Sequence, residues 1–107
     1  MTQGIVTVVK DGKVIIKIIT GSDGKKAAKL AKRIEKDSTL KSAKDLYALA
    51  IKIGFGGEDS LVVLTETKTF HKTGERINRR YRQTFNQPEF NPRWKEGTAE
   101  HVKVVNL

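Results

Sequence analysis

The chain contains no cysteine and only two histidines, His71 and His101, which are far apart. Disulfide bonds, thiolate metal sites and cysteine nucleophiles are therefore excluded for these 107 residues. A histidine-based metal site is not expected, because such a site needs several ligands at a recognisable spacing. Long apolar runs are also absent, so we expect no membrane-spanning segment, no secretory signal and a cytoplasmic location.

Positive charge is the feature that the chain has in excess. It carries 21 Lys and Arg against 12 Asp and Glu, a net charge of +9, with 37% hydrophobic residues. The length suits one small basic domain over residues 1–107. Such a charge favours nucleic acid, an anionic membrane surface or an acidic protein as the partner. It also keeps a small protein soluble, which requires no partner.

A β-hairpin is predicted at the N-terminus, over residues 5–20. Two β-branched runs, IVTVVK and KVIIKIIT, flank Asp11-Gly12. This dipeptide suits a type I′ turn, in which both central residues need a positive φ. Alternation along the strands gives one clearly apolar face and one mixed face, with Lys17 on the mixed one. Strands of this kind usually pack against helices.

Two amphipathic helices are predicted next, over residues 25–36 and about 43–53. In each, four apolar residues fall at i, i+3, i+4 and i+7 and form a single stripe. The first stripe runs from Ala27 to Ile34 and the second from Leu46 to Ile53.

Short polar residues and a glycine indicate where these helices begin and end. Ser22 or Asp23 is expected to cap the first helix. Ser42 and Asp45 have the spacing of a capping box for the second, with Asp in place of the usual Glu. Gly54 is placed to end the second helix in the left-handed conformation.

The second half of the chain predicts further strands. Residues 61–70 alternate as a third strand, residues 72–75 form a turn, and residues 76–85 return as a strand, giving a second hairpin over 61–85. Residues 101–106 form a last strand. The order is ββααβ(β)β, which predicts an α+β domain with a mostly antiparallel sheet packed by two helices.

A basic cluster in residues 68–82 is the first candidate binding site. Arginine forks donate paired hydrogen bonds to phosphate, and an aromatic ring can stack on an unpaired base. The alternative is that Tyr81 and Phe85 fill the core, while the arginines form a solvated face with Glu66 and Glu75 across the hairpin. The candidate residues are Lys68, Lys72, Arg76, Arg79, Arg80, Tyr81 and Arg82.

The first helix supplies a second candidate surface, whose lysines could meet phosphates by charge alone. The alternative is an ordinary solubilising face. The candidate residues are Lys25, Lys26, Lys29, Lys32 and Arg33. The loop before this helix, Gly21-Ser22-Asp23-Gly24, could favour an anion at the helix N-terminus, but it lacks the P-loop spacing and reads more simply as a turn.

These features together predict a non-enzymatic nucleic-acid-binding module that contacts mainly the phosphate backbone. No nucleophile, base or metal constellation indicates catalysis, and no cofactor is expected. The alternative is a protein-interaction or assembly domain, in which the partner is another protein or a second copy of the chain. That alternative would use a strand edge or the aromatic loop 85–97, which contains Phe90 and Trp94.

Overall fold

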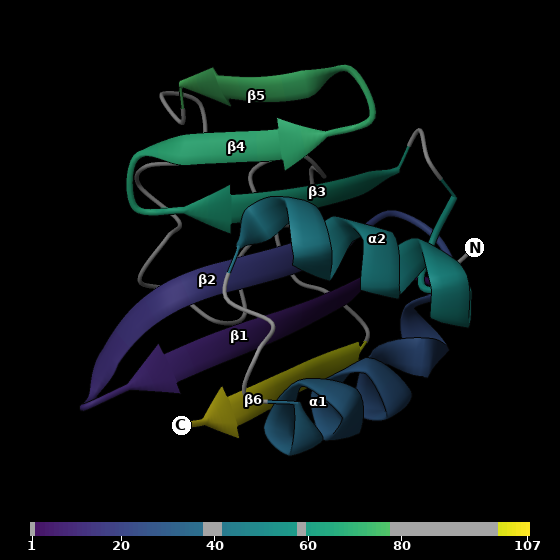
Figure 1. The fold of residues 1–107 in the computed structure, drawn as a ribbon. Coiled ribbons are helices and arrows are strands. Elements are labelled where there is room, and N and C mark those ends of the chain that lie inside the picture. Colours follow the sequence, from purple (N-terminus) through teal and green to yellow (C-terminus); the bar gives the residue numbers. More distant parts are fainter. Residues whose placement is uncertain (1, 38–41, 58–59, 78–100) are drawn as a thin grey trace.

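Six strands form one sheet in the computed structural model, which describes residues 2–37, 42–57, 60–77 and 101–107 (Figure 1). The strand order is β5-β4-β3-β2-β1-β6, and every neighbouring pair is antiparallel except β1 and β6. The predicted α+β class with a mostly antiparallel sheet is confirmed. The strands are β1 (Gly4–Lys10), β2 (Lys13–Thr20), β3 (Leu61–Thr65), β4 (Lys68–His71), β5 (Gly74–Ile77) and β6 (His101–Asn106).

The N-terminal hairpin forms as the sequence predicts. Asp11 and Gly12 both have positive φ, 53° and 77°, as the two central residues of a type I′ turn require. β1 and β2 then pair along their whole length, with one irregularity between Val8 and Val9. The hairpin occupies the middle of the sheet, because β3 pairs with β2 and β6 pairs with β1.

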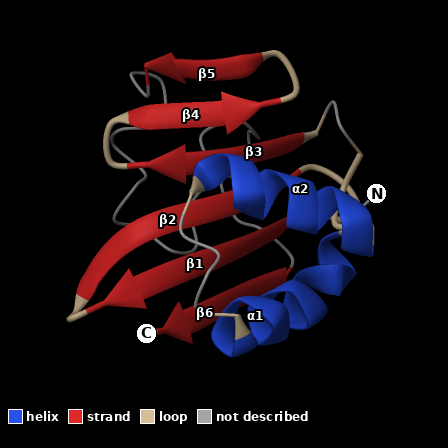
Figure 2. Cartoon of the chain, in the orientation of Figure 1, coloured by secondary structure: helices blue, strands red, loops and turns tan. Residues whose placement is uncertain are grey.

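Both helices of the described chain lie on the same face of the sheet (Figure 2). A 3₁₀ turn, η1 (Gly24–Lys26), leads into α1 (Ala27–Lys36), and α2 (Ala43–Ile53) follows. α1 contacts β1 and β6, whereas α2 contacts β2, β3 and β4. The two helices therefore cover different halves of the sheet.

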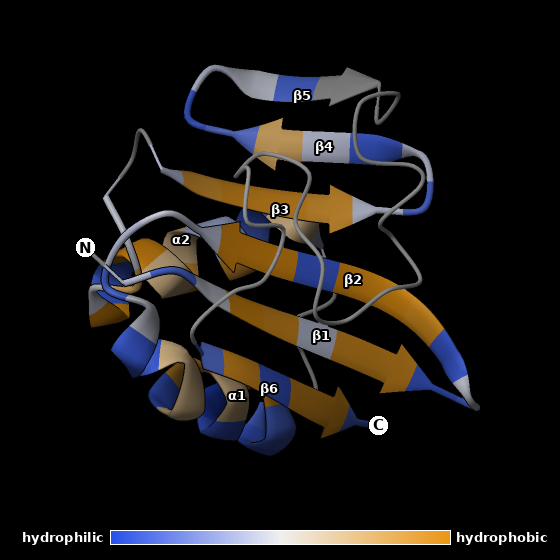
Figure 3. Ribbon diagram, turned by 180° about the vertical axis from the view of Figure 1, so that it is seen from behind, coloured by the Kyte–Doolittle hydropathy of each residue, from blue (hydrophilic) through white to orange (hydrophobic). Residues whose placement is uncertain are grey.

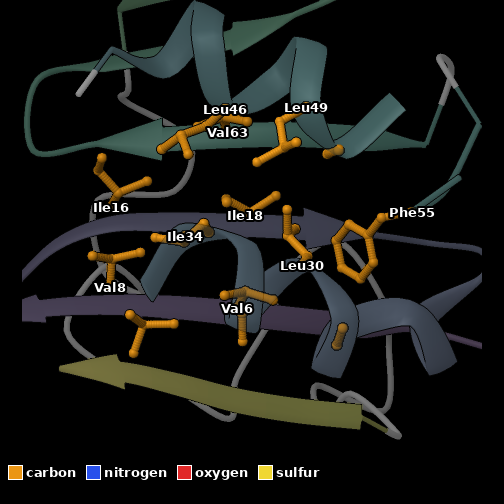
Figure 4. Packing of buried hydrophobic residues seen from close by; sticks show 14 of the residues in the cluster. Val6, Val8, Ile16, Ile18, Leu30, Ile34, Leu46, Leu49, Phe55 and Val63 are labelled. Carbon is orange, nitrogen blue, oxygen red and sulfur yellow. The ribbon is translucent and has the colours of Figure 1, made fainter. Parts of the chain in front are cut away.

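The main core fills the space between the helices and the sheet (Figure 4). The predicted stripe of α1 is buried in full, and Leu46, Leu49 and Ala50 of the α2 stripe are buried, while Ile53 is half-buried. Full burial of one large aliphatic side chain stabilises the fold by about 1.5–3 kcal/mol. The strands contribute Val6, Val8, Ile16, Ile18 and Val63, and Phe55 closes the core after α2.

A second apolar cluster lies on the opposite face of the sheet, away from both helices (Figure 3). It consists of Ile5, Ile19, Val62 and Leu64, with Val14 and Val102 partly buried against it. The central strands are therefore buried on both faces. The mixed face that the alternation predicts is present, but it is not a solvent-exposed one.

The caps of α2 match the prediction and those of α1 do not. The Oγ of Ser42 accepts a hydrogen bond from the N–H of Asp45 at 3.1 Å, and Gly54 ends the helix at φ 84°. Neither Ser22 nor Asp23 caps α1 through its side chain. Instead, Asp23 adopts a left-handed φ of 57°, and the Oγ of Ser22 lies 3.0 Å from the Oγ of Ser60. The hydroxyl of Ser22 therefore contacts a residue that is distant in sequence and does not cap α1.

The predicted strand over residues 61–70 is wrong as a single element. It divides into β3 and β4, because Thr65 closes a tight turn: its Oγ1 accepts from the N–H of Lys68 and donates to the carbonyl of Lys68, both at 3.0 Å. The next turn is at Lys72-Thr73, within the predicted segment, and β5 follows. The rest of the predicted strand 76–85 beyond Ile77, and the aromatic loop 85–97, lie outside the described residues.

The η1 turn packs directly on the start of β1. The N–H of Gly24 donates to the carbonyl of Thr2 at 3.0 Å, and Gly24 is buried. A Cβ at this position would collide with the backbone carbonyl group of Gln3. Only glycine allows the two backbones to approach so closely.

Replacing Gly24 by Ala is therefore expected to lower the free energy of unfolding by about 1–3 kcal/mol, since an added methyl must displace backbone rather than a side-chain end. Chemical denaturation monitored by circular dichroism would measure this change. Gly57→Ala is the matched control, because a Cβ there meets nothing within 4 Å, and it should change stability by less than about 0.5 kcal/mol. Equal effects of the two substitutions would contradict the close approach.

Candidate nucleic-acid interface

The exposed face of η1 and α1 is basic. Successive residues of an α-helix are separated by about 100°, so burial of Ala27, Leu30, Ala31 and Ile34 turns the opposite half of α1 to solvent. Lys29, Lys32, Arg33 and Lys36 lie on that half and are exposed, and Lys25 precedes Lys29 by one turn. We call Lys25, Lys29, Lys32, Arg33 and Lys36 the basic ridge.

The charges of the basic ridge are not neutralised by neighbouring carboxylates. None of its five side chains forms an ion pair or hydrogen bond with a residue in the described ranges. Glu35 is the one acidic residue within α1. The two ion pairs found in the described parts of the chain, Lys13–Glu66 and Lys68–Glu75, lie on other elements. The ridge is therefore a line of cations available to an anionic partner.

Lys26 differs from its neighbours, although the sequence groups it with them. It is exposed, but its Nζ would lie 2.6 Å from a Cβ built on Gly54, so the ammonium group rests against the C-terminal end of α2. A cation is stabilising there, because the last carbonyls of a helix carry partial negative charge. We therefore place Lys26 in the contact between the helices and not in the ridge.

The structure does not bring Lys68 and Lys72 together with the basic residues of α1. Lys68 and Lys72 belong to β4 and the turn that follows, next to the β5 edge of the sheet, whereas α1 packs near the β6 edge. Lys68 and Lys72 are exposed, and the Nζ of Lys68 lies 3.2 Å from the Oε2 of Glu75.

The remaining members of that cluster stay predictions. The backbone of Arg76 belongs to β5, but its side chain is not among the described parts. Arg79, Arg80, Tyr81 and Arg82 lie outside the described residues.

The glycine-bounded loop before α1 uses its polar groups internally. Besides the Gly24 N–H, the N–H of Lys26 donates to the carbonyl of Asp23 at 3.1 Å. The Oγ atoms of Ser22 and Ser60 both accept from the N–H of Gly57, at 3.3 and 3.1 Å. These hydrogen bonds join the loop at the end of β2 to the connection before β3. They favour the interpretation of the loop as a simple turn over that of an anion site.

A buried lysine is the feature that sequence reasoning missed. Lys17 is 0% exposed and lies on the sheet face away from the helices, opposite Thr7 on β1 and Leu64 on β3. Burial lowers the pKa of Lys17 from 10.5 to about 8. The signal was its position inside KVIIKIIT, where apolar residues flank it on both sides.

Thr7 is buried beside Lys17, and its hydroxyl has no hydrogen-bond partner among the described residues.

Within the described ranges, no group of three His, Asp or Glu side chains is arranged to hold a metal ion. No helix in the described part of the chain is long and apolar enough to cross a membrane.

Comparison of the chain with protein-family models, with curated proteins and with solved structures gives no match.

The lowered pKa of Lys17 predicts a pH-dependent stability. Between pH 8 and 10.5 the unfolded chain binds this proton more tightly than the native protein, so the free energy of unfolding rises with pH. The rise attributable to Lys17 is about 3 kcal/mol when complete. Urea unfolding at a series of pH values should show it, and Lys17→Met should lack it. Parallel stability curves for the two proteins would contradict the assignment.

Proposed function

We propose that this protein binds nucleic acid through the basic ridge of η1 and α1. The observation that carries the proposal is the alignment of five exposed cations, none of them paired with a residue in the described ranges, on the half of the helix opposite the core. A phosphate backbone is a regular line of negative charge, and lysines that neutralise it release condensed counterions. The ridge has the charge and the exposure that such binding needs.

A membrane surface is a poorer partner for the same helix. Basic amphipathic helices that bind membranes insert their apolar face among the lipids. In α1 that face, including Leu30 and Ile34, is part of the protein core. Binding to lipid by insertion would therefore require the core to open.

The proposal includes no catalytic step and no cofactor, since binding by charge needs neither. We also propose a cytoplasmic location, because nucleic acid is available there as a partner. The cations of residues 68–82 form a second candidate surface within this proposal, and its described members, Lys68 and Lys72, lie near the sheet edge opposite to the one beside α1.

Removing two ridge charges should weaken binding and its salt dependence together. Lys29→Gln with Lys32→Gln keeps good helix formers at both positions. It should lower affinity for a labelled oligonucleotide by roughly tenfold or more, and should reduce the slope of log K against log salt by about 1.4–1.8. Fluorescence anisotropy at several salt concentrations measures both quantities.

The matched control removes the same charge from the neighbouring helix. Lys44 and Lys52 of α2 are exposed, and Lys44→Gln with Lys52→Gln should leave the affinity close to that of the parent protein. If the two double variants lose affinity equally, binding follows net charge and not the ridge. If the parent protein binds no oligonucleotide even at low salt, the proposed function is wrong.

The β6 edge favours a second candidate, an assembly or protein-interaction role. β6 is the last strand in the sheet order of the described chain, and Val104 on it is 46% exposed. His101 and Leu107 donate backbone hydrogen bonds toward β1, to Gln3 and Val9. Because such bonds alternate along a strand, the N–H of Val104 points away from β1. An outward row of donors is a template for another strand.

This second candidate predicts a proline-sensitive self-association. Val104→Pro removes an outward N–H and leaves the β1–β6 hydrogen bonds in place, so a dimer formed through this edge should dissociate. Val104→Thr keeps the N–H and should retain the dimer. Sedimentation equilibrium over a range of concentrations measures the mass. A parent protein that stays monomeric throughout would remove self-pairing at β6 from consideration.

A further inference from the structure

We infer that the basic ridge recognises double-stranded nucleic acid by its phosphate backbone, without reading bases. This inference rests on the proposed function and names its substrate class. It follows from three properties of α1: the length of its charged line, the residues between the charges, and the way in which the helix is embedded in the fold.

The length of the ridge suits a dense row of phosphates. Eleven residue steps separate Lys25 from Lys36, which corresponds to about 16 Å along a helix axis. Double-stranded DNA carries one charge per about 1.7 Å of its axis, so several phosphates fall within this distance. Each lysine at successive turns can then meet a separate phosphate.

The residues between the charges provide no surface for stacking. Proteins that bind single strands combine a basic groove with aromatic side chains on which bases stack. The exposed positions of α1 other than the ridge are Ala28 and Glu35. Aromatic rings elsewhere in the described chain are held by the fold: Phe55 is buried, and Tyr47 packs edge-on against Phe70 with ring centroids 5.2 Å apart. The ridge therefore offers charge but no base platform.

The embedding of α1 favours contact with the borders of a groove. A recognition helix must enter the major groove, which is about 12 Å wide and about 8.5 Å deep. α1 lies flat on the sheet, in contact with β1 and β6 beneath it and with α2 beside it (Figure 1). Only its outer half is exposed, so the ends of the lysine and arginine side chains meet the phosphates that border a groove.

The test compares a duplex of about 20 base pairs with each of its single strands, by anisotropy at several salt concentrations. We expect the duplex to bind about tenfold more tightly, with a log K against log salt slope of about −4.5 when all five ridge cations contact phosphates. A second duplex of unrelated sequence should bind with the same affinity within about threefold, as expected for contacts to the backbone. Lys29→Gln with Lys32→Gln should weaken duplex binding and remove most of the preference for duplex.

The outcomes separate this inference from the proposed function. If single strands bind as tightly as the duplex, and the ridge variant weakens both, the duplex inference is overturned while nucleic-acid binding stands. If one duplex sequence binds far more tightly than the other, the ridge reads bases and the backbone inference is overturned. If the ridge variant binds every oligonucleotide like the parent protein, both proposals fail.

Discussion

The packing of α1 against β1 and β6 is the constraint on which the surface of this protein depends. Leu30 and Ile34 are buried in the core, and their burial sets the rotation of the helix about its axis. Once that rotation is set, Lys29, Lys32 and Lys36 have no position except the outer line. The same contacts that stabilise the fold therefore separate the charge of this segment from the core and concentrate it on one line.

Burial has a different consequence in the central hairpin, which is formed by β1 and β2. Strands with two covered faces usually read as continuous apolar runs. Between Val14 and Ile19, β2 follows this pattern except at Lys17, which is buried and whose pKa falls as a result. Desolvating an ammonium group costs free energy, and Thr7 opposite it adds a buried hydroxyl. The burial of apolar side chains on the same face of β1, β2 and β3 offsets this cost.

The features that the sequence predicted correctly depend on interactions between residues that are close in the chain. The Asp11-Gly12 turn, the Ser42 cap and the Gly54 terminator each depend on residues within a few positions, and each formed as expected. The errors have two causes, one distant in sequence and one local. Ser22 bonds Ser60 instead of capping α1, and nothing near Ser22 in the sequence indicates that contact. The break at Thr65 depends on one side-chain hydrogen bond pattern, which alternation of apolar residues does not report.

The candidate site shows the same division between local and distant effects. The charged face of α1 could be read from helical periodicity alone, because the core-facing stripe defines its opposite. The separation of that face from Lys68 and Lys72 could not, since it depends on the sheet order. β6 comes from the far end of the chain and pairs in parallel beside β1, which puts α1 near one edge while β4 and β5 extend the other. Because these elements lie near opposite edges of the sheet, the ridge and the pair Lys68 and Lys72 are better treated as independent surfaces than as one continuous groove.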